Sequence, residues 1–267
     1  ITCSLQVWRE QIADLSRDFR VIAFDHRGHG RSSVPPRAQY SLDHLAADVD
    51  AVLDATVKPG QRAVLAGHSM GGIAIGAWSD RFRDRVHQRV DGVALINTTS
   101  GDIIRQVKFL TLPGLLAGSR AAVGSRIVRR FGGIPTVSAA AGPSRRFVAA
   151  LAVGPDADPE VATFVYDMFH RTPRGGRAGA AAMLMDALEG RHLNLDGLTV
   201  PTVVIGSSHD RLLPIAASRR IAATVPNLLD LVELPGGHCA ILERPAEVNA
   251  QLRRLAEAGA AGTSLSS

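Results

Sequence analysis

Short apolar runs alternate with helical patterns along most of the chain, and this order most limits the folds it can adopt. Apolar runs of strand length occupy residues 20–25, 63–67, 92–97, 201–207 and 228–235. Helical spacing occurs at residues 5–18, 41–55, 69–82 and 244–258, with Ser41 as the expected N-cap of the second helix. Runs that are apolar throughout predict parallel strands buried on both faces. We therefore expect an α/β fold with a mostly parallel sheet flanked by helices.

Residues 100–198 interrupt this alternation. The segment is rich in Ala, Gly and Arg, and helical patterns recur at residues 109–118, 145–153, 160–171 and 178–190. We predict a core domain made of residues 1–99 and 199–267, with a helical cap or lid inserted at residues 100–198.

Composition excludes several classes of protein. The chain has 267 residues, 46% of them apolar, which is enough for one large domain with a sizeable core. It has no apolar run of about 18 residues, so we expect no membrane-spanning helix. The net charge is +5, but the arginines are spread among acidic residues, so we expect no nucleic-acid partner. Two cysteines, Cys3 and Cys239, are too few for a disulfide framework, so a reducing cytoplasm is the expected compartment.

Ser69 stands between Gly67 and Gly71 where a predicted strand meets a predicted helix. Glycine suits the outer positions of so sharp a turn because it has no Cβ. Such a turn presents the serine hydroxyl above the carboxyl edge of the sheet, and the N-terminus of the next helix favours a developing negative charge. The pattern indicates a nucleophile.

A serine nucleophile needs a base, and the base needs an acid that orients it. Asp210 follows the strand predicted at 201–207, and His238 lies in a Gly-rich loop after the last strand. The carboxyl ends of parallel strands share one edge of the sheet, so Ser69, Asp210 and His238 should converge there. Asp102, which follows the strand at 92–97, is the alternative acid.

Four segments in this order resemble the α/β-hydrolase superfamily: "FDHRGHGRS", "GHSMGG", "GSSHDRLLP" and "LPGGHCAILERPAEV". The likeness covers nearly the whole chain and points to the subfamily of haloperoxidase-like esterases, lactonases and C–C bond hydrolases. It implies that Ser69 is the nucleophile, His238 the general base and acid, and Asp210 the orienting acid. It also implies that the Met70 N–H is one oxyanion donor.

The resemblance also implies a second oxyanion donor after a His-Gly pair that precedes the first helix, and no such pair stands before the first predicted helix of this sequence. The spacing of "ITCSLQVW" would make Ile1 that donor if His-Gly came just before it. In the family an inner strand precedes that pair, between the strands that end near Asp25 and Gly67. We therefore expect the sequence to be a fragment of a longer protein that supplies this strand.

Other residues admit two interpretations. Asp25, His26 and His29 could suggest a metal cluster, but we interpret them as part of a structural turn and expect no metal and no cofactor. Met168 and Met183, with Met185, could line an apolar acyl pocket or pack between cap helices. Leu212 and Ile241, beside the acid and the histidine, complete the expected pocket.

The predicted activity is that of a serine hydrolase of the esterase type, acting on a small, apolar, ester-like substrate through an acyl-enzyme. One alternative is a cofactor-free perhydrolase, or haloperoxidase, that uses the same triad. Another is a ligand-binding protein on a hydrolase scaffold, because a fold does not determine function.

Overall fold

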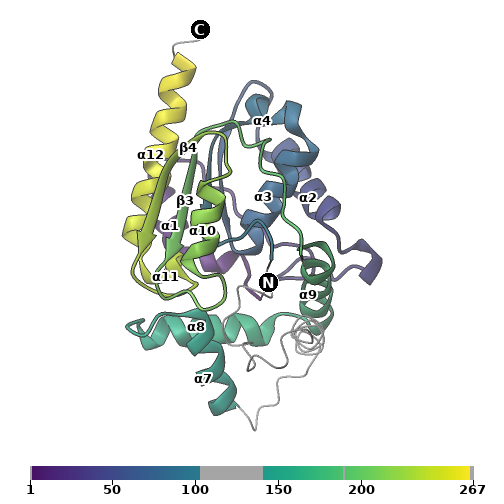
Figure 1. The fold of residues 1–267 in the computed structure, drawn as a ribbon, viewed down its shortest axis with the longest axis vertical. Coiled ribbons are helices and arrows are strands. Elements are labelled where there is room, and N and C mark those ends of the chain that lie inside the picture. Colours follow the sequence, from purple (N-terminus) through teal and green to yellow (C-terminus); the bar gives the residue numbers. More distant parts are fainter. Residues whose placement is uncertain (1, 103–140, 189, 265–267) are drawn as a thin grey trace.

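A parallel sheet lies at the centre of the molecule (Figure 1). The structure is a computed structural model that describes residues 2–102, 141–188 and 190–264. The strands of the sheet are β1 (Ala63–His68), β2 (Val90–Ile96), β3 (Thr202–Ser207) and β4 (Leu228–Leu234), in that spatial order. Each neighbouring pair is parallel, which confirms the predicted α/β fold.

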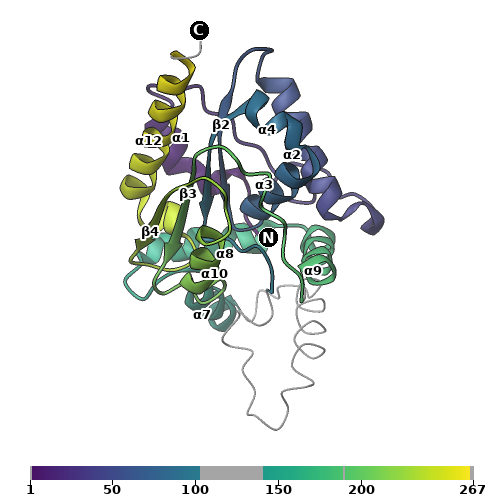
Figure 2. The ribbon, with the colours of Figure 1, turned by 45° about the horizontal axis from the view of Figure 1, so that its top comes forward.

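Helices cover both faces of the sheet (Figure 2). One face packs against α2 (Leu42–Thr56), α3 (Met70–Arg81), α4 (Arg83–Arg89) and α10 (Ile215–Ala222). The other face packs against α1 (Arg9–Leu15), α11 (Ala240–Glu243) and α12 (Pro245–Ser264). The short 3-10 helices η1 (Leu5–Trp8) and η2 (Arg37–Gln39) precede α1 and α2. Among the described helices, none is long and apolar enough to cross a membrane.

The strands are buried on both faces, as their continuous apolar runs predict. In β2, Val93 and Leu95 belong to the hydrophobic cluster under α2 and α3, whereas Ala94 and Ile96 belong to the cluster under α12. This alternation follows from the two-residue period of a strand. At the start of α2, the Ser41 hydroxyl accepts a hydrogen bond from the His44 N–H (3.2 Å), so Ser41 caps the helix as predicted.

Residues 20–25 do not form the predicted strand and are irregular. The side chains of Ile22 and Phe24 are 41% and 36% exposed. A cavity of about 1330 Å³ has both this segment and the residues of β1 in its walls. The only ladder of β1 among the described residues is with β2. A strand needs a backbone partner for its N–H and C=O groups, and no described strand pairs with residues 20–25, so apolar composition alone does not make them a strand.

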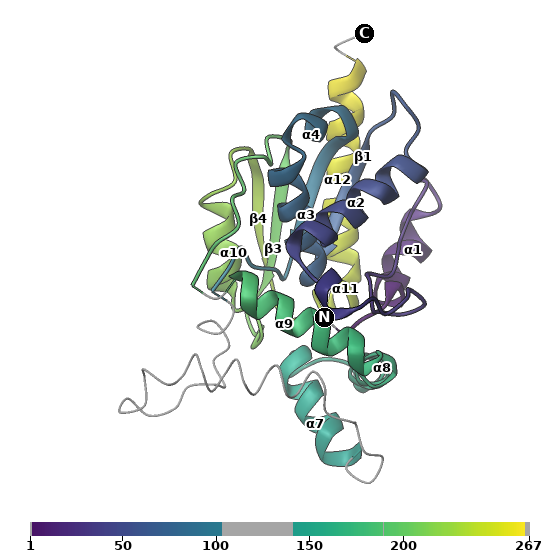
Figure 3. The same cartoon turned by 90° about the vertical axis from the view of Figure 1, so that its right-hand side faces the viewer.

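Three helices from the predicted insertion lie at the end of the sheet where the strands end (Figure 3). They are α7 (Ala141–Ala152), α8 (Pro159–Arg171) and α9 (Arg174–Leu188), and they match three of the four predicted patterns. The fourth, at 109–118, lies outside the described residues. Side chains of α9 join the cluster under α2 and α3, and those of α7 and α8 join the cluster under α12. The cap boundaries at residues 100 and 198 remain a prediction.

Candidate active site

Ser69 lies in the tight turn between β1 and α3. Its backbone has φ 53° and ψ −119°, an unusual conformation for a residue with a side chain. A Cβ on Gly67 would come within 2.6 Å of the backbone of Gly71 and Gly72, so the turn requires glycine there. The Ser69 N–H donates to the Ile96 carbonyl of β2 (3.0 Å), which attaches the turn to the sheet. These constraints hold the serine at the carboxyl end of β1.

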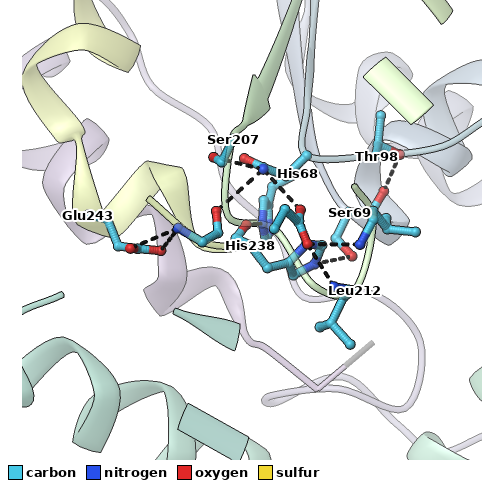
Figure 4. A network of polar contacts seen from close by, with 11 residues as sticks. His68, Ser69, Thr98, Ser207, Leu212, His238 and Glu243 are labelled. Atoms are coloured by element: carbon cyan, nitrogen blue, oxygen red, sulfur yellow. Dashed lines mark hydrogen bonds and ion pairs between the residues drawn. The ribbon is translucent and has the colours of Figure 1, made fainter. Parts of the chain in front are cut away.

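Hydrogen bonds join Ser69, His238 and Asp210 in one chain. Figure 4 labels Ser69 and His238 within this network. Ser69 Oγ lies 3.0 Å from His238 Nε2, and His238 Nδ1 lies 2.8 Å from Asp210 Oδ2. An ionised carboxylate can only accept, so Nδ1 carries the proton and Nε2 is left to accept from the serine hydroxyl. This is the arrangement in which a histidine can act as a base toward Ser69.

Asp210 is held from several sides. Its side chain is fully buried, and Oδ1 accepts from the N–H groups of Leu212 (2.9 Å) and Leu213 (2.8 Å). Oδ2 accepts from the Asn97 side-chain amide (3.0 Å) as well as from His238. We did not single out Asn97 in the sequence. Its position directly after an apolar strand, where Asn tolerates the observed φ of 43°, is the signal that could have identified it.

The alternative acid, Asp102, points to other partners. Its carboxylate lies 3.2 Å from His192 Nε2 and 4.0 Å from Arg220. His209, beside Asp210 in the sequence, is exposed, and its Nδ1 lies 3.0 Å from the Ser208 hydroxyl. The geometry therefore pairs His238 with Asp210, and neither Asp102 nor His209 takes part in the chain.

His68, directly before Ser69 in the sequence, is a further residue that contacts the site. It is buried at the end of β1, and its Nε2 donates to the His238 carbonyl (2.8 Å). Burial, with the neighbouring His238, lowers the pKa of His68 to about 3, so this imidazole is neutral at physiological pH. The hydrogen bond fixes the backbone of His238 from below.

The N-terminus of α3 provides donors for an oxyanion. Met70 is the first residue of the helix, and the N–H groups of a first turn have no acceptor within their own helix. The helix dipole also favours negative charge at this end. Ile1, the expected second donor, lies outside the described residues.

The cavity beside β1 extends to Ser69 and His238. Apolar residues of α8, α9 and the loop after β3 are part of its lining: Val165, Ala181, Leu184, Met185, Leu212 and Leu213. Leu212, which we expect in the pocket, is one of these lining residues. Met168, Met183 and Ile241 are not among the residues that line this cavity, and their side chains are buried in the two hydrophobic clusters. The sequence pattern could not show which methionine of α9 faces the cavity.

The hydrogen bonds of the turn at residues 25–31 give it a structural role. The Asp25 carboxylate accepts from the N–H groups of Leu5 (2.6 Å) and Arg31 (2.9 Å). Burial is the main cause that lowers the pKa of His26 to about 4. Within the described part of the chain, no group of three His, Cys, Asp or Glu side chains is placed to hold a metal ion.

Cys3 and Cys239 are free thiols that pack with the hydrophobic cluster under α12. Burial raises the pKa of the Cys239 thiol well above its usual value. Such a thiol stays protonated at neutral pH and is a poor nucleophile. Neither cysteine therefore competes with Ser69 as a candidate nucleophile.

Comparisons with known proteins show the fold family of this chain. Residues 2–245 match the family model described as the alpha/beta hydrolase fold. A Variovorax paradoxus protein named as a candidate carbamate hydrolase, RutD, is 31% identical over 255 residues, which are 93% of this chain and 86% of that protein. The enol-lactonase of Burkholderia xenovorans LB400 superposes with a TM-score of 0.71 and 27% identity, over 96% of this chain and 88% of the other.

A third relative matches over a shorter stretch. The 3-oxoadipate enol-lactonase 2 of Acinetobacter baylyi is 41% identical over 86 residues, which are 32% of this chain and 31% of that protein. The family match covers most of the chain. The chain therefore belongs to the α/β-hydrolase fold family.

Proposed function

We propose that this chain is a serine hydrolase that cleaves carboxylic esters or related carbonyl compounds through an acyl-enzyme. The observation that carries the proposal is the hydrogen-bonded chain from Ser69 through His238 to Asp210 at one end of an apolar cavity. Relatives named for lactonase and carbamate hydrolase activities support the same class of bond, an acyl carbon attached to oxygen or nitrogen.

In the acylation step, His238 Nε2 takes the Ser69 proton while Oγ adds to the substrate carbonyl carbon. The carbonyl electron pair moves to oxygen, and the Met70 N–H is positioned to stabilise that oxyanion. Asp210 stabilises the imidazolium through Nδ1. The bond to the leaving group then breaks, and His238 gives its proton to the departing oxygen or nitrogen.

In the deacylation step, water takes the place of the leaving group. His238 Nε2 removes one proton from the water as its oxygen adds to the acyl carbon of the ester on Ser69. The second tetrahedral intermediate collapses, and the Ser69 oxygen leaves with the proton from His238. A carboxylic acid is released and the enzyme returns to its starting state.

The cavity favours an uncharged, apolar acyl group. Burial of methylene groups against Val165, Leu184, Met185 and Leu212 is favourable by about 0.8 kcal/mol for each CH₂. We therefore expect kcat/KM to be higher for a butyryl ester than for the corresponding acetyl ester.

The test is hydrolysis of p-nitrophenyl acetate and butyrate by the wild-type chain and by Ser69→Ala. We expect Ser69→Ala to lower kcat by about 10⁴-fold or more, because the nucleophile is lost. Ser208→Ala is the matched control, since Ser208 is an exposed serine in the loop that carries Asp210. A fluorophosphonate should label the wild type and the control once per chain and should not label Ser69→Ala. A folded wild type that is neither active nor labelled would contradict the proposal.

A further inference from the structure

Glu243 turns its carboxylate back toward the loop that carries His238. It is the last residue of α11, which begins two residues after the histidine. Both carboxylate oxygens lie 3.0 Å from the Gly237 N–H, at the residue directly before His238. We call residues 235–239 the histidine loop. The carboxylate therefore holds this loop at the peptide next to His238 (Figure 4).

The same carboxylate reaches the insertion helices. Its Oε2 accepts from the Gly154 N–H (2.8 Å), in the loop between α7 and α8. We call residues 153–158 the α7–α8 loop. Two segments that are more than 80 residues apart in sequence thus share one acceptor group. Charge-assisted hydrogen bonds of this kind are stronger than bonds between neutral groups.

The two loops touch through their backbones. A Cβ on Gly154 would lie 2.9 Å from Gly236 Cα and 2.9 Å from Gly237 N, and a Cβ on Gly237 would overlap Val153. The Cys239 N–H also donates to the Ala152 carbonyl at the end of α7 (3.1 Å). A shift of either loop must therefore move the other or break these contacts.

The position of Glu243 differs from that of a surface carboxylate. In the described part of the chain, no arginine or lysine forms an ion pair with it, and its carboxylate accepts from the N–H groups of Gly154 and Gly237. The other side of the histidine loop is held separately, because His68 donates to the His238 carbonyl (2.8 Å). Glu243 therefore supplies the side-chain attachment of the loop on the side of the insertion helices, next to the backbone bond from Cys239 to Ala152.

We propose that Glu243 is a positioning residue that holds His238 and the cavity wall of the insertion helices in one fixed arrangement. Ala152 at the end of α7 and Val165 on α8 both line the cavity that reaches Ser69. The carboxylate thus couples the position of the base to the position of the acyl-binding wall. The inference rests on the proposed serine hydrolase activity.

The kinetic test compares Glu243→Gln, Glu243→Asp and the control Glu233→Gln. In Glu243→Gln one carboxylate oxygen becomes an NH₂ group, and both oxygen positions face the Gly237 N–H. The negative charge that strengthens the bonds to Gly237 and Gly154 is lost as well. We expect kcat/KM per titrated active serine to fall about 10- to 100-fold, as is typical for groups that orient a functional side chain. The ratio of butyrate to acetate hydrolysis should fall as well, and Glu243→Asp should restore part of both. Glu233, whose carboxylate pairs with Arg219 on the surface (2.8 Å), should tolerate the same change.

A purely structural role gives a different result. If Glu243→Gln lowers the melting temperature but leaves kcat and the acyl preference of the titrated enzyme unchanged, the proposal is overturned. A change in kcat with an unchanged acyl preference also overturns it, because the coupling to the cavity wall would be absent.

Amide hydrogen exchange tests the coupling without any activity. In Glu243→Gln we expect faster exchange in both the histidine loop and the α7–α8 loop, and no change in Glu233→Gln. Faster exchange in one loop alone contradicts the proposal. If the wild type hydrolyses no ester, the proposed function fails, whereas this exchange experiment still decides whether Glu243 joins the two loops.

Discussion

Residues 20–25 and β1 are both six-residue apolar runs followed by a polar turn, yet only β1 is a strand. β1 has a full ladder with β2, from Ala63 to His68. Residues 20–25 face a cavity where β1 has no second partner among the described residues. An apolar run therefore becomes a strand only where another backbone satisfies its polar groups.

The same difference decides which polar residues reach the site. Ser69 and Asp210 follow paired strands, and His238 follows the paired strand β4, so the ladder brings all three to one edge. Asp25 ends the unpaired run, and its carboxylate accepts two backbone N–H groups within the N-terminal segment. Paired strands therefore placed the residues of the site, and the unpaired run did not.

The largest expected effect is on kcat, and it distinguishes an aspartate after a paired strand from one at the end of the unpaired run. Asp210 and Asp25 each accept two backbone N–H groups, but only Asp210 also accepts from His238. We expect Asp210→Asn to lower kcat by about 10⁴-fold, because the amide favours the wrong histidine tautomer. Asp25→Asn should lower stability and leave kcat per titrated serine near the wild-type value. Steady-state kinetics with phosphonate titration measure both, and equal losses of kcat would break the comparison.

The next effect concerns stability. Leu95 of β2 is 1% exposed, whereas Ile22 of the unpaired run is 41% exposed. Leu95→Ala should lower the free energy of unfolding by about 2–5 kcal/mol, because it leaves a cavity in a packed core. Ile22→Ala should change it by less than about 1 kcal/mol, since a large part of that residue stays exposed to water and its loss leaves no closed cavity. Urea titration of the two variants measures the difference, and a larger loss for Ile22→Ala would show that residues 20–25 are packed.

The smallest effect is a pH dependence that compares His68, at the end of β1, with His26, after the unpaired run. Burial lowers the folded-state pKa of His68 to about 3 and that of His26 to about 4. Above pH 6.5 both are neutral in either state and their contribution to stability is complete. As the pH falls from 6.5 toward 4, only the unfolded chain binds the protons, so stability decreases by at most about 1.4 kcal/mol per pH unit for each histidine.

Variants of the two histidines test which residue causes this dependence of stability on pH. We expect His68→Gln and His26→Gln each to flatten the dependence of the urea midpoint on pH between 6.5 and 4. Below pH 4 the slope caused by His26 levels off, whereas the slope caused by His68 continues to about pH 3 because its folded-state pKa is lower. His209→Gln, at an exposed position, is the control and should leave the slope unchanged. An unchanged slope in His68→Gln would show that this histidine is not buried as a neutral group.

Local patterns were enough to predict much of the fold. The runs at 63–67, 92–97, 201–207 and 228–235 match the four strands, and Ser41 caps α2 as expected. Parallel topology then brings Ser69, Asp210 and His238 together, because the carboxyl ends of neighbouring strands share an edge. The glycines around Ser69 marked the turn for a local steric reason.

The sequence by itself thus determined the class of fold, the elbow at Ser69 and the order of the three polar residues, since these depend on spacing and short-range sterics. Only the tertiary structure decided that residues 20–25 stay irregular and that Met185, not Met183, faces the cavity. It also decided the partners of Asn97, His68 and Glu243. Those outcomes depend on contacts between segments far apart in the chain, which no local pattern encodes.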